Sequence, residues 1–196
     1  MRRLFLITLL LSAVMPMWAQ GGTDAEILAS IRSASESINA MHCSFTQTKH
    51  SAMMKDDAVS TGVMSYSSPS RLRWEYREPV NYVMDIDGSC LTIITEDGMQ
   101  SHDTSKERMY AGISEIMLGC MSGQAITDKR LFRSTVSDAD GLWVVSMTPV
   151  RRDMARIFKS VTLTFNPGDC LLRNIVMLDA SDNSTTIEIS DVSINE

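Results

Sequence analysis

The 196-residue chain lacks the residue patterns on which most enzymes and metalloproteins depend. It contains no Cys-x-x-Cys pair, no His-Glu-x-x-His, no Gly-x-Ser-x-Gly and no phosphate-binding loop. Its three histidines have no partner at metal-ligand spacing, and a strand would point the neighbours His42 and Cys43 to opposite faces. We therefore expect no catalytic residue, no metal and no cofactor. A small secreted hydrolase is the alternative, and it would need a thiol of depressed pKa beside a histidine.

Clusters of lysine and arginine are also missing. The formal net charge is −6 at pH 7, and loss of Arg2 and Arg3 with a leader peptide would make it more negative by two. An acidic chain without a basic cluster is a poor candidate for binding nucleic acid or an anionic membrane surface. We expect a monomer that does not bind nucleic acid.

Long apolar runs are absent except at the N-terminus. A basic start, Met1-Arg2-Arg3, precedes an apolar run over residues 4–14, which is typical of a secretory signal peptide cleaved after Ala19. The run is shorter than the roughly 20 residues that span a bilayer, although an uncleaved anchor is the alternative. The sequence predicts a leader over residues 1–19 and one exported domain over residues 20–196.

Cysteine is scarce, and each of the four lies in an otherwise apolar stretch: Cys43, Cys90, Cys120 and Cys170. In an oxidising compartment four cysteines can pair in three ways, among which the sequence does not choose. A domain of this size does not need crosslinks, so we favour buried free thiols over two disulfides.

Two segments have the periodicity of helices. Thr23-x-x-Glu26 is a capping box, and the apolar residues that follow it at near-helical spacing are Ile27, Leu28, Ile31, Ile38 and Met41. A second helix is predicted over residues 112–122, where the apolar residues are Ile113, Ile116, Met117 and Cys120. Residues 126–131 could add a turn, and residues 150–158 fit either a loop or a short amphipathic helix.

The remaining segments alternate apolar and polar residues as strands do. They cover residues 42–50, 59–66, 71–77, 81–86, 90–95, 132–138, 142–148, 160–166, 170–178 and 185–194, and the turn at Asp97-Gly98 predicts one more. A sheet of ten or eleven strands must curl or close. The predicted fold is mainly β (α+β): an incomplete, strongly curved antiparallel β-barrel with helices covering its open mouth.

Large apolar side chains share one face of two neighbouring strands. Leu72, Trp74 and Tyr76 alternate with charged residues in the first strand, and Tyr82, Met84 and Ile86 follow in the next. Such a face either packs as an ordinary core or lines a cavity. Methionine is abundant and adaptable, which suits a cavity for a flexible apolar guest.

The fixed points of this region form an ordered series: Phe45-x-Gln47, Gly62, Pro69 with Leu72 and Trp74, Pro79, and Asp87-Gly88. This series resembles the outer-membrane lipoprotein carrier family (LolA-like). The resemblance implies an incomplete barrel with a helical lid and no enzymatic activity. It implies a periplasmic carrier that shields the acyl chains of lipoproteins during transfer from the inner to the outer membrane.

The resemblance also implies a site and partners. The sheet side of a lipid-binding cavity would comprise Leu72, Trp74, Tyr76, Tyr82, Met84 and Ile86, and the lid would supply Ile113, Ile116, Met117 and Met121. The partners would be acylated lipoproteins or other lipids, an inner-membrane lipoprotein-releasing ABC transporter and an outer-membrane acceptor. A lipid-sensing regulator of the same fold, or a carrier of another lipid or glycolipid, is the alternative.

Three positions depart from the family pattern. Ser68 stands where the family commonly has an arginine that ties the lid, and Thr92 and Ile94 stand where it tends to have tryptophan and tyrosine. Family members also usually continue past the position of Glu196 into another strand. These departures affect the contact that would hold the lid, part of the cavity lining and the transfer of cargo to a receptor.

Overall fold

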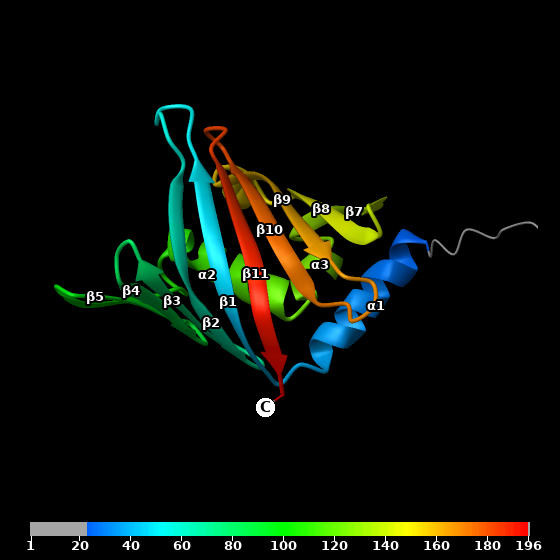
Figure 1. Ribbon diagram of the computed structural model, residues 1–196, viewed down its shortest axis with the longest axis horizontal. Helices are drawn as coiled ribbons and strands as arrows, with labels where there is room; N and C mark the ends of the chain where they lie inside the picture. Colours follow the sequence, from blue (N-terminus) through cyan, green and yellow to red (C-terminus); the bar gives the residue numbers. More distant parts are fainter. Residues whose placement is uncertain (1–22, 196) are drawn as a thin grey trace, which may run out of the picture.

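Eleven strands form one curved antiparallel sheet in the computed structural model, which describes residues 23–195 (Figure 1). The expected leader over residues 1–19 lies outside the described residues. The strands are β1 Ala40–His50, β2 Ala58–Ser67, β3 Arg71–Glu78, β4 Tyr82–Asp87, β5 Cys90–Thr95, β6 Gly98–Asp103, β7 Phe132–Ala139, β8 Leu142–Pro149, β9 Phe158–Phe165, β10 Leu172–Asp179 and β11 Ser184–Ile194. The helices are α1 Asp24–Glu36, α2 Arg108–Met121, α3 Gln124–Thr127 and α4 Arg152–Ala155.

The sheet consists of two meanders that share a central pair of strands. Its order is β6-β5-β4-β3-β2-β1-β11-β10-β9-β8-β7, so that β1 and β11 join the two halves. Within the described residues β6 and β7 each pair on one side only, and the barrel is therefore not closed. The predicted fold class, an incomplete antiparallel barrel with helices, is confirmed.

The chain segment that connects the two meanders forms the helical lid. Because β6 and β7 lie at opposite edges of the sheet, the chain between them must cross from one edge to the other. It crosses with α2 and α3, and Figure 1 shows α2 behind the central strands β1 and β11. Helix α1 lies to one side, where it contacts α3 and β7.

The capping box predicted at the start of α1 is present. Thr23 N–H donates to Glu26 Oε2 over 2.7 Å, and Glu26 N–H donates to Thr23 Oγ1 over 3.4 Å. The helix ends earlier than its apolar spacing indicated, at Glu36. Ile38 and Met41 are buried, but they follow the helix, and Met41 belongs to β1. Their spacing resembles that of a helix only by coincidence, since Met41 already belongs to the alternating pattern of β1.

The predicted Asp-Gly turns are present between consecutive strands. At Asp140-Gly141 both residues have positive φ, 53° and 76°, as a tight hairpin turn requires. The extra turn expected over residues 126–131 lies earlier, as α3 at Gln124–Thr127, and residues 128–131 are not helical. The ambiguous segment 150–158 contains a single helical turn, α4 at Arg152–Ala155.

One glycine lets aromatic rings meet across a strand. Gly62 of β2 lies between Phe45 of β1 and Tyr76 of β3 in the register of the sheet. A Cβ at Gly62 would come within 2.7 Å of the Phe45 ring and 2.0 Å of the Glu75 carbonyl oxygen. Without that Cβ, the ring of Phe45 covers β2 and reaches Trp74 and Tyr76, with centroid distances of 4.8 and 5.1 Å.

The charged face of β3 is on the outside of the sheet, as its alternation predicted. Arg73 Nη1 lies 3.4 Å from Asp85 Oδ2, and Arg71 Nη2 lies 3.5 Å from Asp87 Oδ2. Both arginines therefore pair with carboxylates of the neighbouring strand β4, away from the face that carries Trp74.

All four cysteines are free thiols, but they are not all buried as expected. Cys43 and Cys120 are buried, Cys170 is half-buried and Cys90 is exposed. Cys90 begins β5 after the turn at Gly88, on the opposite face of the strand from its buried neighbour Leu91. In the part of the chain that the structure describes, no helix is both long and apolar enough to cross a membrane.

Candidate functional site: an apolar cavity beneath a helical lid

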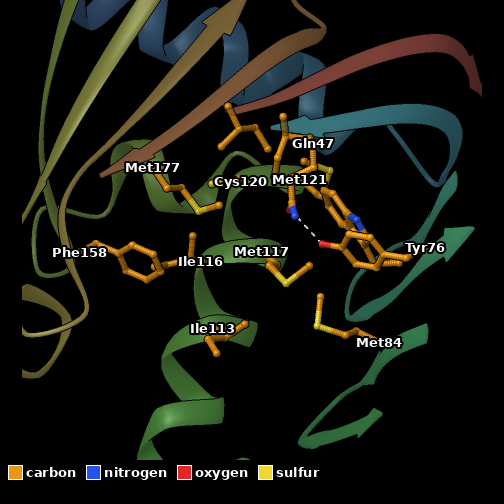
Figure 2. A pocket seen from close by; sticks show the side chains of 13 residues that line it. Gln47, Tyr76, Met84, Ile113, Ile116, Met117, Cys120, Met121, Phe158 and Met177 are labelled. Carbon is orange, nitrogen blue, oxygen red and sulfur yellow. Dashed lines mark hydrogen bonds between the residues drawn. The ribbon is translucent and has the colours of Figure 1, made fainter. Parts of the chain in front are cut away.

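A cavity of about 250 Å³ lies between the sheet and α2. Its lining comes from β1, β3, β4, α2, β9, β10 and β11, so both meanders and the lid contribute. The lining residues are Gln47, Trp74, Tyr76, Met84, Ile113, Ile116, Met117, Cys120, Met121, Phe158, Ile175, Met177 and Ile187 (Figure 2).

The lining is apolar and adaptable. It contains no charged residue, and four of its thirteen residues are methionines: Met84, Met117, Met121 and Met177. Unbranched thioether side chains can repack around guests of different shape. Figure 2 shows Met84 of β4 and Met117 of α2 extending into the same space from the sheet and from the lid.

An aromatic cluster forms the sheet side of the cavity. Tyr76 is stacked on Tyr82, with ring centroids 4.2 Å apart, and meets Phe45 edge-on. Trp74 is 3% exposed, and its indole N–H is fully enclosed without a hydrogen-bond partner. Packed aromatic pairs of this kind hold one another in place.

A single hydrogen bond joins two polar side chains of the lining. Tyr76 Oη donates to Gln47 Oε1 over 2.9 Å (Figure 2). Burial raises the pKa of Tyr76 above its ordinary value, because the ionised phenolate would lose its hydration. The tyrosine therefore stays neutral and remains a donor.

The structure brings seven of the ten predicted site residues together around the cavity: Trp74, Tyr76, Met84, Ile113, Ile116, Met117 and Met121. The other three do not line it. Leu72 and Ile86 face each other in the register of β3 and β4, and both are 0% exposed and pack in the core. Tyr82 lies on the other side of the Tyr76 ring. That any of these residues binds lipid stays a prediction.

Six lining residues were not in the predicted site. Cys120 continues the helical spacing of Ile113, Ile116 and Met117, and that periodicity could have identified it. Gln47 belongs to the Phe-x-Gln pattern, but its side chain alone does not indicate a cavity. The others are Phe158, Ile175, Met177 and Ile187, and they come from the second meander, whose closeness to β3 and β4 is a property of the curved sheet.

Small residues on α2 set the position of the lid. A Cβ at Gly119 would come within 2.8 Å of the Ala125 Cβ of α3. A Cβ at Gly112 would lie 3.3 Å from Met154 Sδ of α4. These close approaches hold α2 between the two short helices, with its apolar side toward the cavity.

Polar contacts attach the helical lid to β6 and to the loop before α4. Arg151, before α4, lies 3.1 Å from Glu115 Oε2 of α2. At the start of α2, His102 Nδ1 lies 3.1 Å from Glu107 Oε2, and the His102 ring stacks on Tyr110 at 3.9 Å. These contacts join α2 and its N-terminal end to neighbouring segments.

The chemistry of the site is that of binding. Burial raises the pKa of the Cys120 thiol to about 12 and that of Cys43 to about 12, the opposite of what a nucleophilic cysteine needs. His42, beside Cys43 in sequence, is exposed and lies 2.9 Å from Ser65 Oγ. No cluster of metal-binding side chains occurs among the described residues. An apolar cavity beneath α2 without a charged lining residue has the chemistry of a binding site for an apolar ligand.

Sequence comparison places the chain in a family of such proteins. The family described as "Outer membrane lipoprotein carrier protein LolA" matches residues 36–196, and the chain belongs to this family. An outer-membrane lipoprotein carrier protein of Dechloromonas aromatica (strain RCB) is 25% identical over 183 residues, which cover 93% of this chain and 83% of the relative. One from Cupriavidus taiwanensis is 22% identical over 187 residues, 93% of this chain and 85% of the relative.

Solved structures agree with this fold. A LolA superfamily protein from Nitrosomonas europaea has a TM-score of 0.50 at 12% identity, with 90% of this chain and 95% of that chain covered. A putative outer membrane lipoprotein-sorting protein domain from Vibrio parahaemolyticus has a TM-score of 0.50 at 8% identity, with 87% and 91% covered. At these identities the likeness concerns the fold.

Proposed function

We propose that this protein is a periplasmic carrier that shields the acyl chains of lipoproteins as they pass from the inner to the outer membrane. The observation that carries the proposal is the apolar cavity between the sheet and α2, which has no charged lining residue. Family membership and the curated relatives, which are named outer-membrane lipoprotein carriers, support the same assignment.

The energetics of transit favour such a cavity. Exposing an acyl chain to water costs about 0.8 kcal/mol for each CH₂ group. A carrier must cover the chain and later give it up, so a pliable apolar lining serves better than a tight pocket with many polar contacts. The methionines of β4, α2 and β10 provide that pliability.

The size of the cavity requires the lid to move. An engineered cavity of roughly 150 Å³ holds one benzene molecule, and by that scale about 250 Å³ has room for roughly ten carbon atoms. A long acyl chain needs more room. Displacement of α2 would open the space between the two meanders, since this helix closes the cavity on the side away from the sheet.

Cargo and partners follow from the carrier role. Acylated lipoproteins would enter from an inner-membrane ABC transporter and leave to an outer-membrane acceptor. Ser68, in place of a lid-binding arginine, favours one alternative within the same class, a carrier of another lipid or glycolipid. In both versions the ligand enters as a hydrocarbon chain.

Native mass spectrometry of the purified mature protein tests the proposal. We expect adducts whose masses correspond to acylated species and which dissociate on activation. Adducts of lipoprotein mass support the lipoprotein carrier, and lipid or glycolipid masses support the alternative cargo. A protein that stays free of adducts and also fails to bind acyl chains added in detergent-free solution would refute both.

A further inference from the structure

We propose that Gln47 binds the carbonyl oxygen of the ester or amide that attaches an acyl chain to its carrier molecule, so that the cavity selects acyl chains over plain alkyl chains. This inference deepens the proposed function and depends on it. It assigns to Gln47 a recognition role, distinct from the apolar contacts of the other lining residues.

The position of Gln47 is unusual for its chemistry. It lies on β1 in a lining that is otherwise aliphatic, aromatic or sulfur-containing. An amide placed in apolar surroundings loses its hydration and needs hydrogen-bond partners in return. Oε1 has such a partner in the hydroxyl of Tyr76, 2.9 Å away.

The amide nitrogen of Gln47 has no partner in the described part of the chain. Tyr76 is the one group that hydrogen-bonds this side chain there, and it uses Oε1. The nitrogen is not among the unpaired polar atoms that are fully enclosed, and Gln47 is half-buried, so a ligand in the cavity can reach it. The two N–H donors of this cavity-lining side chain therefore have no protein acceptor among the described residues.

A second donor of the same lining is also unpaired. The indole N–H of Trp74 is enclosed without a hydrogen-bond partner, and it would come into reach only if the cavity widens. The acceptor Gln47 Oε1 is already used by Tyr76. The site thus has a surplus of donors, and its complement is a ligand that brings an acceptor.

The acceptor should be uncharged. A phosphate or carboxylate in this cavity would have no cation to pair with, since no lysine, arginine or histidine lines it, and burying an unpaired charge is very costly. A carbonyl oxygen accepts hydrogen bonds without carrying a charge. It is also the polar atom that every ester-linked or amide-linked acyl chain has at its head.

Two lipids that differ by one carbonyl group test the inference. Palmitoyl lysophosphatidylcholine and its hexadecyl ether analogue, both below their critical micelle concentrations, would compete with a fluorescent apolar probe for the cavity. A neutral hydrogen bond contributes about 1 kcal/mol, so the ester should bind roughly fivefold more tightly to the wild type. Gln47→Met should abolish this preference and leave the affinity for the ether unchanged or higher.

Two further variants separate recognition from structure. Gln100→Met changes an exposed glutamine of β6 and should retain the preference for the ester. Tyr76→Phe removes the hydroxyl that donates to Gln47 Oε1. The amide then loses its fixed orientation, so the preference for the ester should decrease without disappearing. If Gln47 merely positions Tyr76, Tyr76→Phe and Gln47→Met would shift both lipids equally.

The outcomes distinguish this inference from the proposed function. Equal binding of ester and ether by the wild type overturns the role of Gln47 and leaves the carrier function standing. Failure of both lipids to displace the probe counts against the carrier function itself. The comparison of the two lipids on the wild type does not depend on whether any variant folds.

Discussion

Replacing Met84 with glutamate should abolish ligand binding while the protein stays folded. Met84 lies on β4, is half-buried and faces the cavity opposite Met117 of the lid (Figure 2). Because the side chain is not fully enclosed, a carboxylate at this position can stay hydrated while the cavity is empty. The fold should therefore tolerate the change.

The expected loss of affinity is large because the ligand would have to dehydrate the new charge. Contact with an apolar side chain such as methionine contributes about 1.5–3 kcal/mol when it is fully buried. Burying an unpaired carboxylate adds a further penalty of several kcal/mol in a real protein. We expect binding to weaken at least 100-fold, which corresponds to about 2.7 kcal/mol.

The assay is displacement of a fluorescent apolar probe, with thermal unfolding measured in parallel. The matched control is Met99→Glu, since Met99 of β6 is 69% exposed and does not line the cavity. Its affinity should equal that of the wild type. Acidification below the ordinary glutamate pKa of about 4.3 should restore part of the binding to Met84→Glu, because the neutral acid is cheaper to bury. Wild-type affinity in a folded Met84→Glu protein at neutral pH would show that the ligand does not occupy this cavity.

Four other predictions concern the fold, the lid and the thiols. Gly62→Ala should lower the free energy of unfolding by about 3 kcal/mol through overpacking. Gly88→Ala should lower it by only about 1 kcal/mol, because φ at Gly88 is 59° but the space around it is open. Equal losses of the two variants in urea titrations would contradict this. Glu115→Gln removes the ion pair between α2 and the loop before α4, a half-exposed contact that contributes about 0.5 kcal/mol. The rate of ligand release, measured by stopped flow, should therefore increase about twofold at low salt and should not change at high salt. A maleimide should label Cys90 in the native protein but Cys120 only on unfolding. Folding raises the pKa of the Cys120 thiol from 9.0 to about 12. The unfolded chain therefore loses this proton at a lower pH than the folded chain, and the free energy of unfolding should fall as the pH rises from 9 toward 12. An unfolding midpoint that does not change over that pH range would contradict this.

Local patterns were sufficient for most of the fold. Strict alternation identified the strands because one face of the sheet is buried and the other carries ion pairs such as Arg73 with Asp85. The Asp-Gly turns fixed which strands are neighbours along each meander. The error at the end of α1 arose at Ile38 and Met41, where apolar residues on a helix and on the following strand happen to share one spacing.

The site was predicted only in part, and the reason is geometric. Periodicity shows which residues share a face, and so it identified Trp74, Tyr76 and Met84 together with the lid residues of α2. It does not show where along that face the two halves of the sheet separate enough to leave space. Leu72 and Ile86 share the face of Trp74, but they are fully buried against other side chains and form core.

The sequence by itself determined that this chain forms a largely antiparallel β domain with one apolar face, since alternation and turn chemistry act between residues a few positions apart. The tertiary structure alone decided that β1 pairs with β11, that α2 crosses the hollow face and that a space remains beneath it. The pairing of β1 with β11 depends on contacts between residues more than 100 positions apart, such as Phe45 with Ile189. The position of α2 depends on its contacts with β3 and α3. The curvature of an eleven-stranded sheet and the close approach of α2 to its neighbouring helices set the volume that stays empty.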